Sequence, residues 1–188
     1  MDALQIAVIV GSLRKESFNR HLTNAIVRLA PTTVGFHFVE IGDLPLYNQD
    51  DDEHQANAVL RMKSEIENTD GVLFVTPEYN RSIPGVLKNA LDHGSRPFGS
   101  NSWGKKPAAI IGISPSPVGT ALAQQHLRGV LATLNMPTLC QPEMFLQMKD
   151  GFFDEAGNIG EGSKQFLLRW IEVMINWIRS HSGHDKLA

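Results

Sequence analysis

Cysteine is nearly absent from the sequence. Cys140 is the single cysteine among 188 residues, so no internal disulfide can form. This excludes the disulfide-linked scaffolds of small secreted proteins and favours a reducing compartment. Stability must therefore come from a hydrophobic core, and a hydrophobic content of 42% in a chain of this length suits a single domain over residues 1–188.

The sequence also lacks an excess of positive charge and any long apolar run. The 17 basic residues are outnumbered by 20 acidic ones, and a net charge of −3 gives no electrostatic basis for binding nucleic acid. No apolar run approaches the ~20 residues that a membrane-spanning helix requires. The apolar run Ile6–Val10 is too short for a signal peptide and has no basic flank before it, so we expect a strand there. These features predict a cytoplasmic protein that binds no nucleic acid and has no membrane span.

Two well-known phosphate motifs are missing from the loop that follows this strand. Gly11 is the only glycine between Val10 and Gly35, so the three-glycine fingerprint of dinucleotide-binding folds is absent. The helix start also has no Gly-Lys-Ser or Gly-Lys-Thr, which excludes a nucleoside-triphosphate loop. A ligand with one terminal phosphate remains the best candidate.

The loop does contain donors for such a phosphate. Residues 11–19 read Gly-Ser-Leu-Arg-Lys-Glu-Ser-Phe-Asn and lead from the strand into a helix. Free N–H groups at a helix start, small polar side chains and the guanidinium of Arg14 together suit the phosphate of a mononucleotide such as FMN. Taken alone, the loop is explained equally well by Ser12 or Ser17 as an ordinary helix N-cap and by Arg14 as a solvated surface residue.

Strand-like and helix-like segments alternate along the whole chain. Strands are expected at 6–10, 34–40, 71–76, 107–113 and 137–145, and helices at 17–29, 54–68, 84–93, 120–134 and 163–180. Such alternation predicts an α/β fold, in which helical crossovers cover both faces of a five-stranded parallel sheet.

Two segments lie outside these expected elements. We expect residues 181–188 to form a frayed tail. Residues 94–104 form the most flexible-looking segment, either a lid or a plain connector. Its aromatic residues, Phe98 and Trp103, are expected to be exposed, which slightly favours a contact role.

Two further polar loops are expected at the edge of the sheet that carries the phosphate loop. Ligands of such sheets bind at the carboxyl ends of the strands, and residues 76–85 and 114–120 follow the third and fourth strands. Each loop could present backbone donors to a flat heteroaromatic ring, although the composition of 77–80 is also common in ordinary turns. The convergence of three loops favours a mononucleotide site more strongly than any one loop does.

The motifs at 11–19 and at 77–92, Pro-Glu-Tyr-Asn-(x)2-Ile-Pro-Gly-Val-Leu-Lys-Asn-Ala-Leu-Asp, resemble those of the NADPH-dependent FMN reductase family. The resemblance covers nearly the whole chain and is greatest to the soluble quinone and chromate reductases. It implies a flavodoxin-like, three-layer doubly wound fold, bound FMN, NADPH or NADH as co-substrate, and a homodimer or tetramer. The residues that it implies for cofactor binding are Ser12, Arg14, Ser17, Phe18 and Asn19 at the phosphate and ribityl end, Pro77, Glu78, Tyr79 and Asn80 beside the ring, and Ser114 near its pyrimidine edge.

The expected chemistry belongs to the flavin, and no side chain is expected to be catalytic. The nicotinamide passes hydride to flavin N5, and a quinone, chromate, azo or nitro compound then takes the electrons. Arg81 and Arg96 are candidates for binding a 2′-phosphate or an anionic acceptor. No metal is expected, because the histidines show no ligand spacing. A flavodoxin-like one-electron carrier and a non-enzymatic flavin-binding protein remain as alternatives.

Overall fold

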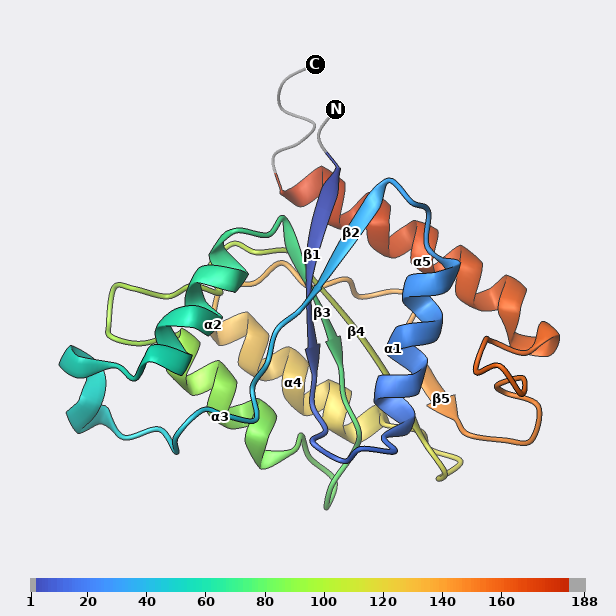
Figure 1. The fold of residues 1–188 in the computed structure, drawn as a ribbon, viewed down its shortest axis with the longest axis horizontal. Helices are drawn as coiled ribbons and strands as arrows, with labels where there is room; N and C mark the ends of the chain where they lie inside the picture. The colour runs from blue at the N-terminus through green and yellow to red at the C-terminus, as the bar shows by residue number, and fades with distance from the viewer. Residues whose placement is uncertain (1–2, 183–188) are drawn as a thin grey trace.

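Five parallel strands in the order β2-β1-β3-β4-β5 form the central sheet of the computed structural model, which describes residues 3–182 (Figure 1). The strands are β1 (Leu4–Val10), β2 (Val34–Phe38), β3 (Gly71–Val75), β4 (Ala108–Ser114) and β5 (Phe145–Gln147). The helices are α1 (Phe18–Leu29), α2 (Asn57–Glu67), α3 (Gly85–Gly94), α4 (Ala121–Thr133) and α5 (Glu161–His181), with a short 3₁₀ helix, η1 (Gln49–His54). The strand order and the flanking helices confirm the flavodoxin-like α/β fold.

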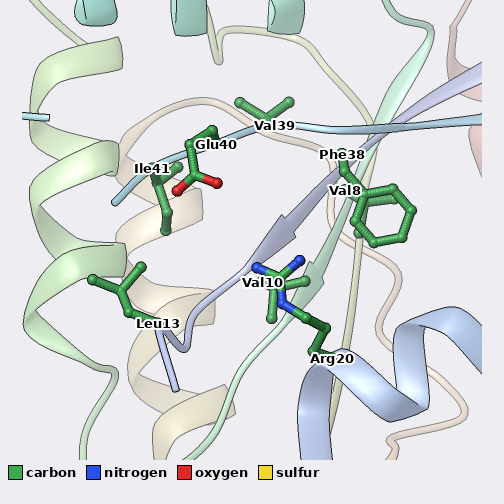
Figure 2. A pocket seen from close by; sticks show the side chains of 8 residues that line it. All are labelled: Val8, Val10, Leu13, Arg20, Phe38, Val39, Glu40 and Ile41. Atoms are coloured by element: carbon green, nitrogen blue, oxygen red, sulfur yellow. The ribbon is translucent and has the colours of Figure 1, made fainter. Parts of the chain in front are cut away.

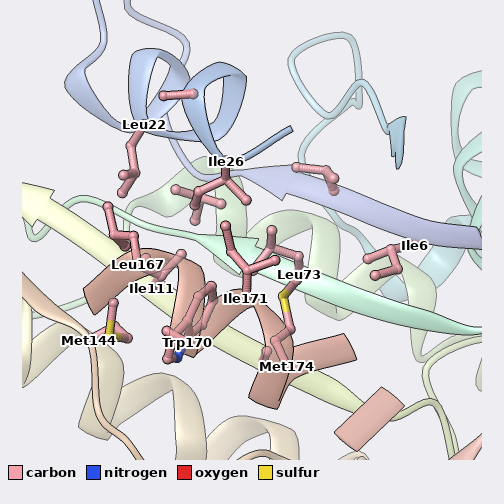
Figure 3. Close-up of a cluster of buried hydrophobic side chains, with 14 of the residues drawn as sticks. Ile6, Leu22, Ile26, Leu73, Ile111, Met144, Leu167, Trp170, Ile171 and Met174 are labelled. Atoms are coloured by element: carbon pink, nitrogen blue, oxygen red, sulfur yellow. The ribbon is translucent and has the colours of Figure 1, made fainter. Parts of the chain in front are cut away.

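Helices cover both faces of the sheet. α1 and α5 pack on one face, where Leu22, Ile26 and Trp170 meet side chains of β1, β3 and β4 (Figure 3). α2, α3 and α4 pack on the other face around Phe74 and Leu127. Residues of β3 are buried along its whole length, which explains why that strand is a continuous apolar run rather than an alternating one.

The fifth strand and the C-terminal end differ from expectation. Only Phe145–Gln147 pairs with β4 as a strand, and residues 137–144 contribute a single isolated bridge from Thr138 to Ala108. Pro137 and Pro142 lack the N–H that a continuous ladder needs, so the expected strand at 137–145 was wrong in position. α5 continues to His181 and Ser182 is its C-cap, so the first two residues of the expected frayed tail belong to the helix end, and residues 183–188 lie outside the described residues.

The segment between α3 and β4 is anchored by a buried aromatic ring. Trp103 is fully buried, its Nε1 donates to the carbonyl of Leu91 at 3.1 Å, and its ring centroid lies 5.9 Å from that of Phe74. A Cβ at Gly94 would lie 2.3 Å from the Trp103 ring nitrogen, so only glycine permits this packing. The expectation that Trp103 is exposed was therefore wrong, whereas Phe98 is 94% exposed as expected.

Candidate functional site

Three loops meet at the carboxyl edge of the sheet, which is the lower edge in Figure 1: residues 11–17 after β1, 76–84 after β3 and 115–120 after β4. Hydrogen bonds join the first loop to the end of β3 and the second loop to the start of α4. The N–H of Gly11 donates to the carbonyl of Val75 at 2.9 Å, and the Glu78 carboxylate accepts the N–H of Leu122 at 3.0 Å. The three loops of the sequence analysis therefore lie side by side.

The first loop ends in a capped helix. Ser17 is the N-cap of α1, and its hydroxyl oxygen accepts the N–H of Arg20 at 3.4 Å. The Ser12 hydroxyl oxygen accepts the N–H of Arg14 at 3.4 Å. Both serines are almost fully buried, and neither hydroxyl donates to an acceptor within residues 3–182. Two buried O–H donors are thus left for a ligand that supplies acceptors.

Backbone N–H groups and one guanidinium surround these hydroxyls. Within the described chain, no intramolecular acceptor faces the N–H groups of Leu13, Lys15 and Glu16, or those of Phe18 and Asn19 in the first turn of α1. Arg14 is exposed, and its guanidinium carbon lies 5.0 Å from the centre of the Phe18 ring, while one of its amino groups donates to the carbonyl of Glu16. Most of its donors remain available. The donor set fits a phosphate dianion at the positive end of the α1 dipole.

Asn19 has a second role that the sequence did not indicate. Its side-chain Nδ2 donates to the carbonyl of Ile113 at 3.0 Å, and its Oδ1 accepts the N–H of Ile113 at 3.0 Å. The last β4 residue in register with β3 is Ile111, so the buried Asn19 amide takes the place of a strand partner beyond that point. What Asn19 leaves for a ligand is its backbone N–H in the first turn of α1.

The second loop is shaped by a tight turn. Tyr79 and Ser82 pair through both backbone groups, at 3.0 and 3.1 Å, and the two residues between them have positive φ angles, 52° for Asn80 and 65° for Arg81. Such a turn normally takes Asn followed by Gly, so Arg81 occupies a conformation that disfavours a side chain. The Tyr79 ring and the Arg81 guanidinium are both exposed at the tip of the loop.

The carboxylate of Glu78 faces other parts of the protein. One oxygen accepts the N–H groups of Leu122 and Ala123 at 3.0 and 3.1 Å, and the other lies 3.7 Å from a guanidinium nitrogen of Arg81. Ser82 Oγ lies 2.6 Å from Nδ1 of His126, farther along α4. Sequence reasoning missed this Ser–His contact, and the only available signal was the helical spacing of 122 and 126 on one face of α4.

The third loop is closed largely on itself. The Ser114 hydroxyl donates to the carbonyl of Gly119 at 2.6 Å, and the N–H of Gly119 donates to the carbonyl of Ser116 at 2.9 Å. Gly119 has φ +63°, where a side chain is strained. Of the donors expected from this loop, Ser116 and Thr120 keep N–H groups with no acceptor in the described chain.

Arg96 lies apart from the three loops. It follows the end of α3, a helix of 10 residues and hence about 15 Å long, while residues 76–84 precede its start. Its guanidinium donates to Tyr47 and Asp52, both at 2.9 Å. The hydrogen bond with the Tyr47 hydroxyl, assisted by the Asp52 carboxylate, raises the pKa of Arg96 above its ordinary value. The structure therefore brings Arg81, but not Arg96, to the edge that carries the loops.

A small cavity lies on the β2 side of the first loop. Figure 2 shows Leu13, Arg20, Phe38 and Glu40 among the side chains around it. Its volume of about 30 Å³ admits one or two water molecules and no aromatic ring. Within residues 3–182 no group of three His, Cys, Asp or Glu side chains is placed to hold a metal ion, and no helix in that range is long and apolar enough to cross a membrane.

Comparisons with known proteins identify the family of the chain. Residues 4–150 match the model of the NADPH-dependent FMN reductase family. A 2-hydroxy-1,4-benzoquinone reductase from Burkholderia sp. is 50% identical over 178 residues, covering 94% of this chain and 97% of the relative. A quinone reductase from Pseudomonas putida is 43% identical over 175 residues, covering 93% and 94%. The structure of FerB, a flavoenzyme NAD(P)H:(acceptor) oxidoreductase from Paracoccus denitrificans, superposes with a TM-score of 0.91 at 42% identity, covering 95% of this chain and 98% of that one.

The pair of hydrogen bonds between the Asn19 side chain and the backbone of Ile113 gives a testable prediction. Asn19→Ala leaves the N–H and carbonyl of Ile113 buried without partners, so we expect the free energy of unfolding to fall by about 2–3 kcal/mol in urea titrations. Asn176→Ala, on the exposed face of α5, serves as the control and should change it by less than about 0.5 kcal/mol. Equal stability of the two variants would contradict the role assigned to Asn19.

Proposed function

The chain belongs to the NADPH-dependent FMN reductase family, and on that premise we propose that it binds FMN across the three loops and reduces quinones with NADPH or NADH. A small-molecule acceptor is what its quinone-reducing relatives imply. The enzyme is an oxidoreductase whose chemistry is carried by the cofactor rather than by a side chain.

The observation that supports this proposal most directly is the donor set of the first loop. The two buried serine hydroxyls donate no hydrogen bond within the described chain, and free N–H groups and a guanidinium surround them. Such donors are unfavourable when left unpaired, so a ligand that accepts several hydrogen bonds stabilises them. A phosphate monoester is that ligand, and FMN ends in one.

We assign residues to the cofactor accordingly. Ser12, Arg14 and Ser17 would bind the phosphate through side chains, and Phe18 and Asn19 would bind it through the first turn of α1. Within residues 77–80, the backbone N–H groups of Glu78 and Asn80 have no acceptor in the described chain, so Pro77, Glu78, Tyr79 and Asn80 are assigned to the edge and face of the ring. Ser114 would act by shaping its own loop, since its hydroxyl already donates to Gly119.

Bound FMN would accept hydride from the nicotinamide and pass the electrons to the quinone. The protein's part is to hold the ring with backbone donors, to place Tyr79 beside it and to offer a cation at the entrance. Arg81 fits that last role because its guanidinium is 70% exposed and its only ionic partner within residues 3–182 is Glu78 at 3.7 Å. We assign Arg81, in preference to Arg96, to the 2′-phosphate of NADPH or to an anionic acceptor.

We also propose that the protein is a cytoplasmic homodimer. The family resemblance supports a dimer. So do four large apolar side chains left exposed on the loops and on α4 at the carboxyl edge, since a subunit contact would cover them. They are Leu13, Tyr79, Val118 and Leu122.

The function is tested by the visible spectrum of FMN-loaded protein mixed with excess NADPH in the absence of oxygen. We expect the flavin absorbance to disappear within the mixing time and to return when a benzoquinone is added. A bound flavin that stays oxidised would instead support a one-electron carrier or a non-enzymatic flavin-binding protein.

The phosphate site is tested by a pair of cations in one loop. Arg14→Ala removes charge-assisted hydrogen bonds, so the dissociation constant of FMN should rise about tenfold or more, measured by quenching of FMN fluorescence. Lys15→Ala removes the same charge from an exposed neighbour and should change the constant by less than about threefold. If both variants weaken binding equally, the loop attracts FMN by net charge alone and Arg14 makes no specific contact.

The role of Arg81 is tested by comparing the two nicotinamides. Arg81→Gly suits the positive φ angle, so it removes the guanidinium without adding backbone strain. We expect KM for NADPH to rise about fivefold while KM for NADH changes less than twofold, and Arg81→Lys to lie in between. Equal changes for both nicotinamides would exclude recognition of the 2′-phosphate by Arg81.

A further inference from the structure

We propose that Glu78 is a positioning residue that fixes the ring-binding loop to α4 through its carboxylate. The inference rests on the proposed function, because it concerns the loop assigned to the FMN ring. The family resemblance implied that Glu78 lies beside the ring as a cofactor-binding residue. In the structure its side chain instead contacts the N-terminus of α4, at Leu122, 44 residues away along the chain.

The Glu78 carboxylate caps the N-terminus of α4, although it lies on a different loop. Oε2 accepts the N–H groups of both Leu122 and Ala123, at 3.0 and 3.1 Å, in the first turn of α4. A negative charge at this end of a helix interacts favourably with the helix dipole, and hydrogen bonds to an ionised oxygen are stronger than neutral ones. The side chain is only 11% exposed, so water screens these contacts weakly.

α4 has no side-chain cap of its own. Thr120 stands at its N-cap position, but the buried hydroxyl accepts Nε2 of Gln124 at 2.9 Å and makes no capping bond. The first N–H of the helix, that of Ala121, reaches the carbonyl of Val118 only at 3.4 Å. A threonine at the N-cap position normally caps its own helix, but the Thr120 hydroxyl is bonded to Gln124 instead. Glu78 therefore supplies the capping hydrogen bonds of α4.

The same carboxylate also constrains the tip of its loop. Its second oxygen faces the guanidinium of Arg81 at 3.7 Å, and the Tyr79–Ser82 pair holds Arg81 in the turn. Ser82 is joined to His126 at 2.6 Å, one helical turn beyond Leu122. Contacts from both ends of the turn thus meet consecutive turns of α4, and the peptide groups between them are held in one orientation.

Holding this loop has a direct consequence for the ring. The unpartnered N–H groups of Glu78 and Asn80 lie on the backbone that the carboxylate fixes. Less conformational entropy is lost on binding when the donors are already held in position. A fixed loop therefore binds the ring more tightly than a loose one. Loss of the carboxylate should therefore weaken FMN binding even though the carboxylate itself makes no contact with FMN.

The test compares Glu78→Ala with Glu78→Gln in the full-length, FMN-binding protein. Alanine removes both hydrogen bonds, so the dissociation constant of FMN should rise about tenfold, while glutamine keeps an acceptor oxygen and should stay within about threefold of wild type. Amide hydrogen exchange at Leu122 and Ala123 should be faster in Glu78→Ala. Glu143→Gln is the charge-matched control, because the Glu143 carboxylate accepts a hydrogen bond from the Gln125 side chain of α4 and none from the backbone of α4 within residues 3–182, and it should leave FMN affinity unchanged.

A second variant separates loop positioning from helix stability. In the Glu78→Ala background, Ala121→Glu restores a negative charge to the first turn of α4 without joining it to the loop. We expect Tm to recover while FMN affinity stays weak. Recovery of both would show that Glu78 acts only by stabilising α4, and unchanged affinity in Glu78→Ala would also overturn the proposal. Wild-type protein that fails to bind FMN would instead overturn the proposed function.

Discussion

The burial of β1, β3 and β4 on both faces is the constraint on which the rest of the structure depends. Parallel strands in such a sheet must pair all their backbone groups with neighbours, and helices must cover both faces. The strands then end together at one edge, and the loops after them are brought to the same place whatever their own sequences are. Gly112 illustrates how tightly the strand ends are packed, since a Cβ there would lie 2.2 Å from the carbonyl oxygen of Thr76.

The polar residues at that edge divide into two groups. Asn19 and Glu78 use their side chains to join separate parts of the chain, to Ile113 and to the start of α4 respectively. Ser12, Ser17 and Arg14 keep donors that the described protein does not use. The first group holds the loops in place and the second group is left to bind. A site for a cofactor that performs the chemistry needs this division more than it needs a catalytic acid or base.

The turn at 79–82 shows how specificity can be added without changing the fold. Its backbone favours glycine at the third position, and this chain has Arg81 there, held by the paired Tyr79 and Ser82 and by the Glu78 carboxylate. The cost of the left-handed conformation is about 1 kcal/mol, which neighbouring contacts of this kind can offset. In the proposed function, this loop would offer a cation at the entrance while its other residues face the ring.

The sequence by itself determined the class of fold and most elements to within a few residues, and it predicted the loop to which phosphate binding is assigned in the proposed function. Apolar periodicity is local and a helix N-cap is local, so Ile6–Val10 and Ser17 could be interpreted without knowing anything else about the chain. Tertiary structure alone decided the partners of Asn19 and Glu78, the burial of Trp103 and the separation of Arg96 from the site. Each of these depends on a residue distant in sequence, 94 positions away for Asn19 and 44 for Glu78. Such hydrogen-bond partners come within reach of a polar side chain only when burial has brought distant segments together. No local sequence pattern therefore predicts them.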